Sequence, residues 1–197
     1  MRRAGDAPRG WYRGTTRCAE EPSAGPMHSG ERLRNVEDMI VAENLSKDFG
    51  AKHAVSDISF TVQPGKVTGF LGPNGAGKST TIKMLTGLLA PTSGSVRILG
   101  EDVSDPGRAL AVKRRVGVVP ENLALFDNLT AREYLTFIGR MYLLPPETVR
   151  ARCDELLAIM DLAHEHKELT LEFSCGLKKR LALAAALFPN PELLFLD

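Results

Sequence analysis

Alternation of hydrophobic and polar positions picks out the first strands of the chain. Short β runs are predicted over residues 40–45 and 53–62, and in the second run Ile58, Phe60 and Val62 alternate with polar neighbours. Further apolar runs predict strands at residues 66–71, 95–99, 116–119 and 193–196. The run VGVV at 116–119 contains no polar position, which is typical of a strand buried on both faces.

Apolar residues recur at helical spacing between these strands. A helix over residues 79–89 places Ile82, Leu85 and Leu89 on one side. Two more helices are separated by Pro145 and Pro146. Their expected apolar faces are Tyr134, Phe137, Ile138 and Met141 for the first, and Val149, Cys153, Leu156, Leu157 and Met160 for the second. A last helix is predicted over residues 177–188. The alternation of predicted strands and helices along the chain indicates an α/β fold with a mostly parallel core sheet.

The first 38 residues show no apolar periodicity and are rich in Arg, Gly and Pro. They lack the apolar stretch of a secretory signal peptide. Two interpretations remain open: a disordered tail, or translated sequence upstream of a true start at Met27 or Met39. We favour the second, because a strand-like segment begins directly after Met39. The folded domain is therefore expected over residues 39–197.

Charge and composition narrow the classes of function. The 25 Lys and Arg residues are balanced by 24 Asp and Glu residues, so no nucleic-acid partner is expected. No stretch approaches the length of an apolar membrane span, so any membrane event must involve another chain. The cysteines (Cys18, Cys153 and Cys175) match neither a disulfide framework nor a metal-ligand pattern, which favours a reducing, cytoplasmic setting.

The segment GPNGAGKS at residues 72–79 carries the strongest chemical signal. It matches GxxxxGK[ST], the phosphate-binding loop, and lies between a predicted strand and a predicted helix. Glycines let backbone N–H groups converge on a phosphate, Lys78 places a positive charge on the β- and γ-phosphates, and the Ser79 hydroxyl ligates Mg²⁺. The nucleotide-binding residues expected here are Gly72, Pro73, Asn74, Gly75, Ala76, Gly77, Lys78, Ser79 and Thr80.

Two further segments follow the loop in a characteristic order. FSCGLKKR at residues 173–180 resembles the signature of ABC transporter ATPases, LSGGQ followed by basic residues, and departs from it at Phe173, Cys175 and Leu177. Taken alone it also fits an ordinary helix capped by Ser174. LLFLD at residues 193–197 resembles the Walker B strand of the same family, whose Asp, here Asp197, helps to hold Mg²⁺. In this order, the three segments make residues 39–197 similar to ABC transporter ATPases, most like those of bacterial ABC-2-type exporters.

Two lesser matches agree with this resemblance. Phe49 stands where the family places an aromatic ring that stacks on adenine, although a core aromatic in a β-hairpin is the simpler interpretation. Glu121 stands in the place of the family's Q-loop Gln, which reaches the Mg²⁺ shell. A Glu keeps an oxygen suited to a hard cation and adds a negative charge.

The resemblance implies a P-loop NTPase core with an N-terminal antiparallel β subdomain and an inserted helical subdomain over about residues 123–180. It also implies a head-to-tail dimer enclosing two ATP molecules with Mg²⁺, and a second ATPase subunit that is identical or different. The ATP bound by the partner subunit would then face the signature residues Ser174, Cys175, Gly176 and Leu177. ABC permease transmembrane subunits would contact the helical block, which places the chain on the inner face of the cell membrane. Alkylation of Cys175 is then expected to block closure of the dimer, and bound ATP is expected to slow the alkylation.

Hydrolysis in this family needs a Glu directly after the Walker B Asp and a His on a later strand. The 197 residues end at Asp197, so the expectation is a C-terminally truncated ATPase domain that binds ATP without turnover, with Lys78 and Asp197 contributing to an incomplete catalytic site. His164 and His166 precede the signature, where the switch His does not occur.

Three alternative functions make different demands on the sequence. A soluble ABC ATPase of translation or DNA repair usually carries tandem cassettes or coiled-coil arms, and no heptad run occurs here. A GTPase would need the guanine-reading NKxD, and the sequence contains no Asn-Lys pair. A binding-only regulatory subunit, paired with an intact ATPase, remains an alternative.

Overall fold

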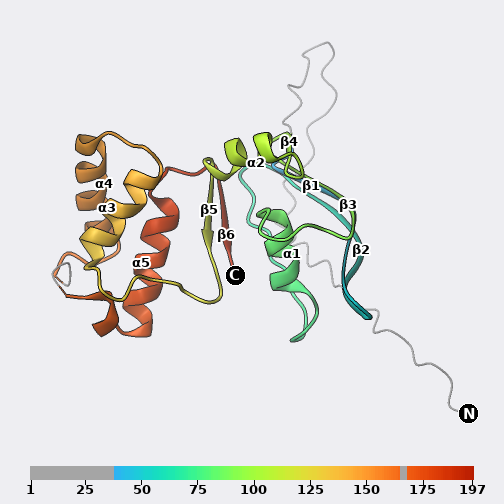
Figure 1. The fold of residues 1–197 in the computed structure, drawn as a ribbon, viewed down its shortest axis with the longest axis horizontal. Helices are drawn as coiled ribbons and strands as arrows, with labels where there is room; N and C mark the ends of the chain where they lie inside the picture. Colours follow the sequence, from blue (N-terminus) through green and yellow to red (C-terminus); the bar gives the residue numbers. More distant parts are fainter. Residues whose placement is uncertain (1–37, 165–167) are drawn as a thin grey trace, which may run out of the picture.

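The fold is that of a computed structural model, which describes residues 38–164 and 168–197. The N-terminal segment 1–37, with Cys18 and Met27, and residue His166 lie outside the described residues. The β-rich part and the helical part of the chain lie on opposite sides of a central pair of strands, β5 and β6 (Figure 1). None of the helices in the described ranges is long and apolar enough to span a bilayer.

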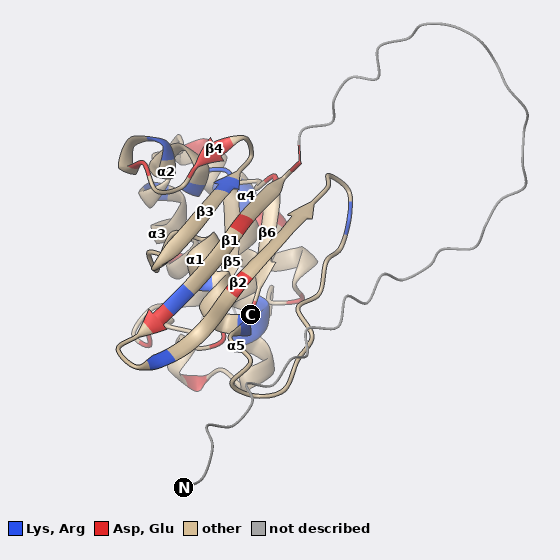
Figure 2. Ribbon diagram, turned by 90° about the vertical axis from the view of Figure 1, so that its right-hand side faces the viewer, with Lys and Arg blue, Asp and Glu red and all other residues tan. Residues whose placement is uncertain are grey.

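Four strands form an antiparallel sheet in the order β2-β1-β3-β4. Their bounds are Ile40–Phe49 for β1, Lys52–Val62 for β2, Ser93–Ile98 for β3 and Glu101–Asp102 for β4. The long β1–β2 hairpin gives the sheet its extended face (Figure 2). Both hairpin strands alternate buried and exposed positions, because one face of the sheet covers a core and the other meets solvent. This sheet is the N-terminal antiparallel β subdomain that the sequence predicts.

The second sheet contains two parallel strands, β5 (Val116–Val119) and β6 (Leu193–Leu196). Residue Val116 pairs with Leu193 and Val119 with Leu196. The Arg115 guanidinium donates to both carboxylate oxygens of Glu192, at 2.6 and 2.7 Å. This bidentate pair precedes both strands directly, so it holds their register, and the Arg115 hydrogen bonds hold the pKa of Glu192 below its usual value.

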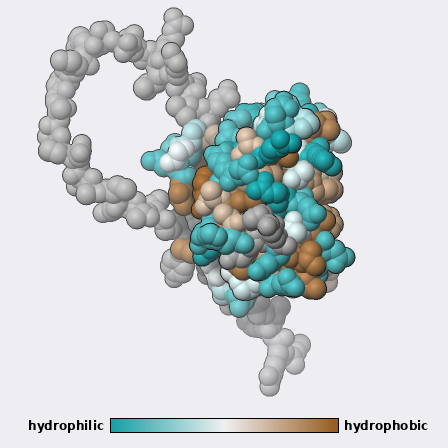
Figure 3. All heavy atoms as spheres, turned by 90° about the vertical axis from the view of Figure 1, so that its left-hand side faces the viewer, coloured by the Kyte–Doolittle hydropathy of each residue, from teal (hydrophilic) through white to brown (hydrophobic). Residues whose placement is uncertain are grey.

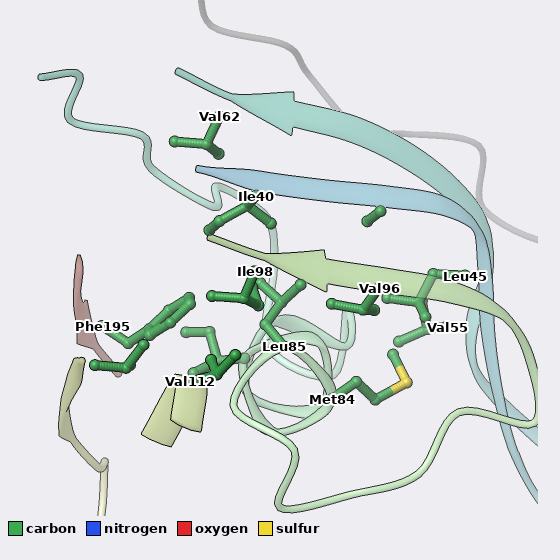
Figure 4. Packing of buried hydrophobic residues seen from close by; sticks show 13 residues of the cluster. Ile40, Leu45, Val55, Val62, Met84, Leu85, Val96, Ile98, Val112 and Phe195 are labelled. Atoms are coloured by element: carbon green, nitrogen blue, oxygen red, sulfur yellow. The ribbon is translucent and has the colours of Figure 1, made fainter. Parts of the chain in front are cut away.

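The first core lies between the antiparallel sheet and the strands β5 and β6. Helices α1 (Lys78–Leu85) and α2 (Pro106–Lys113) contribute Met84, Leu85 and Val112 to it. Leu45, Val55 and Ile98 point into this core from the sheet, and Phe195 enters it from β6 (Figure 4). The core therefore fixes α1, and with it the loop that precedes α1, against both sheets.

The second core is helical. It is formed by α3 (Ala131–Met141), α4 (Pro146–Ile159) and α5 (Cys175–Leu187), with the short 3₁₀ turn η1 (Thr170–Glu172) between the last two. A capping box starts α3, in which Thr130 accepts from the Glu133 N–H and the Glu133 carboxylate accepts from the Thr130 N–H. Gly139 lets α3 approach closely, since a Cβ there would meet Phe188 and Val149.

Two sequence-based expectations need correction. Residues 66–71 do not form a strand: a strand needs a hydrogen-bonded neighbour, and this segment has none among the described residues. As a result Val67 is fully exposed and Leu71 is 65% exposed. The core sheet is parallel as expected, in β5 and β6, and it lies beside the antiparallel N-terminal sheet. Helix α1 ends at Leu85, short of the predicted residue 89, because Gly87 adopts a left-handed conformation (φ 66°).

The apolar face of α3 was also assigned too broadly. Tyr134 is buried and Ile138 packs on the helical core, but Phe137 is 39% and Met141 66% exposed. The buried stripe runs through Ala131, Leu135 and Gly139, and its two small residues do not stand out in the hydrophobic pattern. The face predicted for α4 is largely buried.

Candidate functional site

The phosphate-type loop joins the extended segment 66–71 to α1. Gly75 and Gly77 have positive φ angles of 84° and 86°, which a residue with a side chain adopts only under strain. At Gly77 there is also no room, since a Cβ would meet the Ala54 carbonyl oxygen and Val55 of β2. The loop is therefore seated directly on the β1–β2 hairpin.

The loop leaves backbone donors unpaired at the start of α1. Gly77 is the N-cap residue and supplies no side-chain cap. The buried Thr81 hydroxyl donates to the Gly77 carbonyl oxygen at 2.9 Å, and so does the Thr81 N–H at 2.8 Å, which anchors this turn. The N–H groups of Lys78, Ser79 and Thr80 are the orphan donors of the first helical turn. Such a helix start attracts an anion.

Lys78 lies across this loop. Its Nζ donates to the carbonyl oxygens of Gly72 at 3.0 Å and Pro73 at 2.9 Å. The positive charge is thereby held next to the orphan N–H groups by two neutral acceptors, and no carboxylate neutralises it within the described residues. The combination is an anion site formed by backbone dipoles and one fixed cation.

Three oxygen-bearing side chains converge at the end of the loop. The Ser79 hydroxyl donates to Asp197 Oδ1 at 2.8 Å and lies 3.5 Å from Glu121 Oε2. Asp197 follows β6 directly and Glu121 comes two residues after β5, so the parallel pairing brings both carboxylates to one end of the sheet. The structure thus brings together the three residues that the sequence assigned to Mg²⁺.

These three oxygen-bearing side chains suit a Mg²⁺ ion that is bound together with phosphate oxygens. They are too few for a metal held by protein side chains alone. Mg²⁺ prefers oxygen ligands and is usually bound by one or two carboxylates together with substrate phosphates. No group of three or more His, Cys, Asp or Glu side chains suited to a metal occurs in the described part of the chain. A cation between Ser79, Asp197 and Glu121 would therefore complete its shell with phosphate oxygens and water.

Phe49 ends β1 next to the hairpin turn. Its ring is 51% exposed and has the Lys47 ammonium 5.3 Å from its centroid. Lys47 pairs across the hairpin with Val55, which contacts Gly77 of the phosphate-type loop. Phe49 is two residues from Lys47 on the same strand, so it lies near the part of the hairpin that contacts the loop. An aromatic side chain exposed to this extent can stack on a flat ring, here with the Lys47 ammonium over its own ring.

The signature-like segment lies apart from this site, at the start of α5 in the helical part. Ser174 is the N-cap residue, and its hydroxyl accepts from the Leu177 N–H at 3.3 Å. Phe173 and Leu177 pack on the helical core, whereas Cys175 and Gly176 are exposed. Within the described ranges, no hydrogen bond or ion pair joins these residues to the loop 72–79. At the two positions where this segment departs from LSGGQ with an apolar residue, Phe173 and Leu177, the side chain packs on the helical core.

Sequence reasoning missed two supports of the site. Thr81, one of two buried polar residues in the described ranges, holds the loop to α1. The Arg115–Glu192 pair joins the residues directly before β5 and β6, whose parallel pairing brings Asp197 to Ser79. The signal for this pair was present, because each residue directly precedes a run that predicts a buried strand.

The fold and the site together define a P-loop nucleotide-binding protein of the α/β class. The sequence matches the family described as "ABC transporter" over residues 55–197. The chain belongs to this family.

Curated relatives are ATP-binding proteins of exporter and resistance systems. The chain is 42% identical over 160 residues to the linearmycin resistance ATP-binding protein LnrL of Bacillus subtilis, covering 81% of this chain and 50% of the relative. It is 41% identical over 159 residues to the bacitracin transport ATP-binding protein BcrA of Bacillus licheniformis, covering 81% and 50%. The chain thus spans about half the length of the curated relatives that it matches.

Solved structures show the same fold. A structure described as the ATP-binding subunit of an ABC transporter superposes with a TM-score of 0.72 at 30% identity, over 81% of this chain and 65% of the other. The cbiO1 protein of Clostridium perfringens, part of the ABC transporter complex cbiONQ, gives a TM-score of 0.71 at 28% identity, with the same coverage.

Proposed function

We propose that this chain is the ATP-binding part of an ABC transporter ATPase subunit and that it binds ATP with Mg²⁺ at the loop 72–79. The observation that carries the proposal is the contact of Ser79 with both Asp197 and Glu121. These residues come from three separate elements, and they meet beside a cation and the unpaired donors of a helix start.

Each residue has a distinct task in this proposal. The N–H groups of the loop and of the first turn of α1 bind the phosphates, from Gly72 through Thr80. Lys78 leaves its two carbonyl acceptors and donates to the β- and γ-phosphates, which are stronger acceptors because they are charged. Ser79, Asp197 and Glu121 would hold the Mg²⁺ that neutralises charge on the phosphates. Phe49 stacks on the adenine.

The signature residues act on a second nucleotide in this proposal. The start of α5 is exposed and lies in the helical part, away from the chain's own loop. In a head-to-tail dimer, with an identical or different ATPase subunit, Ser174, Cys175, Gly176 and Leu177 would meet the ATP of the partner. A helix N-terminus with exposed small residues suits a γ-phosphate.

We further propose that a separate membrane permease uses this ATP cycle for transport, with export favoured by the resistance and transport functions for which the relatives are named. The permease would contact the helical subdomain, about residues 123–180, and hold the chain at the cytoplasmic face of the membrane. A soluble ABC ATPase and a binding-only regulatory subunit are the alternatives. Co-purification with a permease would argue against a soluble ABC ATPase, and co-purification with a second, different ATPase subunit as well would favour the regulatory subunit.

The 197 residues themselves are proposed to bind ATP without turnover. Glu121 and Asp197 are the carboxylates in contact with Ser79 among the described residues, and both are assigned to the cation. No further carboxylate of the described part is placed there to orient a water molecule. Phosphate release by these 197 residues, if abolished by Lys78→Ala, would contradict this proposal.

Nucleotide binding is expected to depend on Mg²⁺ through Asp197. Asp197→Asn removes one charged ligand, so the gain in ATP affinity on adding Mg²⁺ should fall about tenfold or more, because a charged hydrogen-bond or metal partner contributes about 1.5–3 kcal/mol. Titration of a fluorescent ATP analogue, with Mg²⁺ and with EDTA, measures this gain. Asp38→Asn, a residue outside the site, is the matched control. An unchanged Mg²⁺ effect in Asp197→Asn would remove Asp197 from the site.

Thiol labelling tests the proposed dimer. Cys175 is exposed, whereas Cys153 is buried and burial raises the pKa of its thiol, so Cys175 should react much faster with an alkylating reagent. A Cys18→Ser variant leaves these two thiols to be compared. Mg-ATP should slow labelling of Cys175 if a dimer closes over it. Equal rates with and without ATP would argue against the trans contact.

A further inference from the structure

The groove between α3 and α4 carries a group of arginines that the nucleotide site does not use. A cavity of about 380 Å³ lies there, lined by Arg132 and Arg140 from α3 and by Arg150 from α4. We call it the α3–α4 groove. Helices α3 and α4 lie on the outer side of the helical part (Figure 1), and the surface on that side is mostly hydrophilic with interspersed hydrophobic patches (Figure 3).

The positive charge of this groove is only partly neutralised. Arg132 pairs with Asp154, which also lines the groove, at 2.7 Å. Arg140 and Arg150 are exposed, and neither side chain has an ion pair or hydrogen bond with another described residue. Three guanidinium groups therefore face one carboxylate, and two of them are available to an outside anion.

The remaining lining of the groove is neutral and mostly apolar. Val149 and Pro146 contribute from the first turn of α4, where no side chain caps the helix. The Thr136 hydroxyl lies 3.7 Å from the sulfur of Cys153. Burial raises the pKa of that thiol, so it stays neutral and does not oppose an anion. The start of α4 adds a partial positive charge, which the Glu147 carboxylate in the same turn opposes, so the arginines carry the attraction for an anion.

We propose that the α3–α4 groove binds a phosphate ester that carries an apolar portion, with Arg140 and Arg150 holding the phosphate. Guanidinium groups match phosphate oxygens with paired N–H donors, which an ammonium cannot do. The apolar side chains between the two helices receive the carbon chain of the ester. The ligand is either a phospholipid head group or a soluble phosphate ester, and both present the same chemistry to the arginines.

Calorimetric titration of the full chain with dihexanoyl phosphatidic acid tests this proposal. Glycerol 3-phosphate, which has the same head group without acyl chains, forms the second arm. Arg140→Gln/Arg150→Gln should weaken binding by about tenfold or more, because two charge-assisted contacts are lost. Lys52→Gln/Arg114→Gln removes the same charge from exposed positions elsewhere and should leave the affinity unchanged. Lys78→Ala, tested in parallel, identifies any probe bound at the nucleotide loop.

The outcomes separate the two sources of the phosphate. Binding of the lipid alone supports a lipid head group, and binding of both probes with the lipid bound more tightly supports a soluble ester. Equal affinities for the two probes would contradict the role given to the apolar side chains. The proposal is overturned if neither probe binds, if Arg140→Gln/Arg150→Gln leaves the affinity unchanged, or if Lys78→Ala abolishes binding. The ATP-binding proposal does not depend on any of these results.

Discussion

Replacing Lys78 by alanine is expected to weaken Mg-ATP binding about a hundredfold, because charge-assisted hydrogen bonds to phosphate contribute about 1.5–3 kcal/mol each. In the structure the Lys78 ammonium is held over the loop by Gly72 and Pro73, at 3.0 and 2.9 Å. Alanine removes both the charge that meets the phosphates and the two bonds that shape the loop. Equilibrium titration with a fluorescent ATP analogue measures the change in affinity.

The matched control is Lys83→Ala in the same helix. Lys83 is exposed in the last turn of α1, so its loss removes the same charge without touching the loop. We expect less than about a twofold change in affinity for this variant, as for an exposed charge outside the contact. Similar affinities in the Lys78→Ala variant and the original chain would remove the loop 72–79 from the nucleotide site.

Replacing Gly117 by alanine is expected to destabilise the fold by about 1–3 kcal/mol, toward the upper end of what overpacking produces. A Cβ at Gly117 would meet the carbonyl oxygen of Ala186 in α5 and would lie 2.9 Å from Leu194 Cδ1 in β6. The carbonyl belongs to helix backbone, so it cannot turn away as a side chain would. Helix α5 or strand β6 must shift instead. Urea unfolding followed by circular dichroism measures the loss.

The control for this variant is Gly107→Ala in α2. The nearest atom to a Cβ at Gly107 is Asp105 Oδ1 at 3.4 Å, an ordinary contact, and the N–H that caps the helix is retained. Alanine here should stabilise the chain by up to about 1 kcal/mol through helix propensity. If Gly117→Ala proved as stable as Gly107→Ala, the close packing of α5 on β5 would be wrong.

Much of the nucleotide site could be predicted because its main elements are local. The loop needs glycines at positions whose backbone angles only glycine adopts freely, and the sequence places Gly75 and Gly77 there. The assignment of Ser79 and Asp197 to one cation site did not rest on local features. It rested on the resemblance to a family pattern, because the two residues are far apart in sequence. The geometry confirms that contact, while the roles of the residues stay proposals.

The errors arose where a residue's state depends on distant neighbours. Residues 66–71 have the composition of a buried strand, yet no described strand pairs with them. Phe137 and Met141 repeat at helical spacing, yet α3 packs through Ala131 and Gly139, whose small side chains permit close approach. Hydrophobic spacing indicates that a face exists, and packing selects which face is buried.

By itself, the sequence determined the local features of this protein: the glycine-dependent loop, the capping box at Thr130 and the break at Pro145 and Pro146. These depend on residues within a few positions of one another, so their chemistry can be read along the chain. Tertiary structure alone decided which face of α3 is buried, that 66–71 lacks a partner, and that Arg115 and Glu192 align the strands behind Ser79 and Asp197. Those outcomes rest on contacts between residues far apart in sequence, whose free energy appears only when the chain is packed.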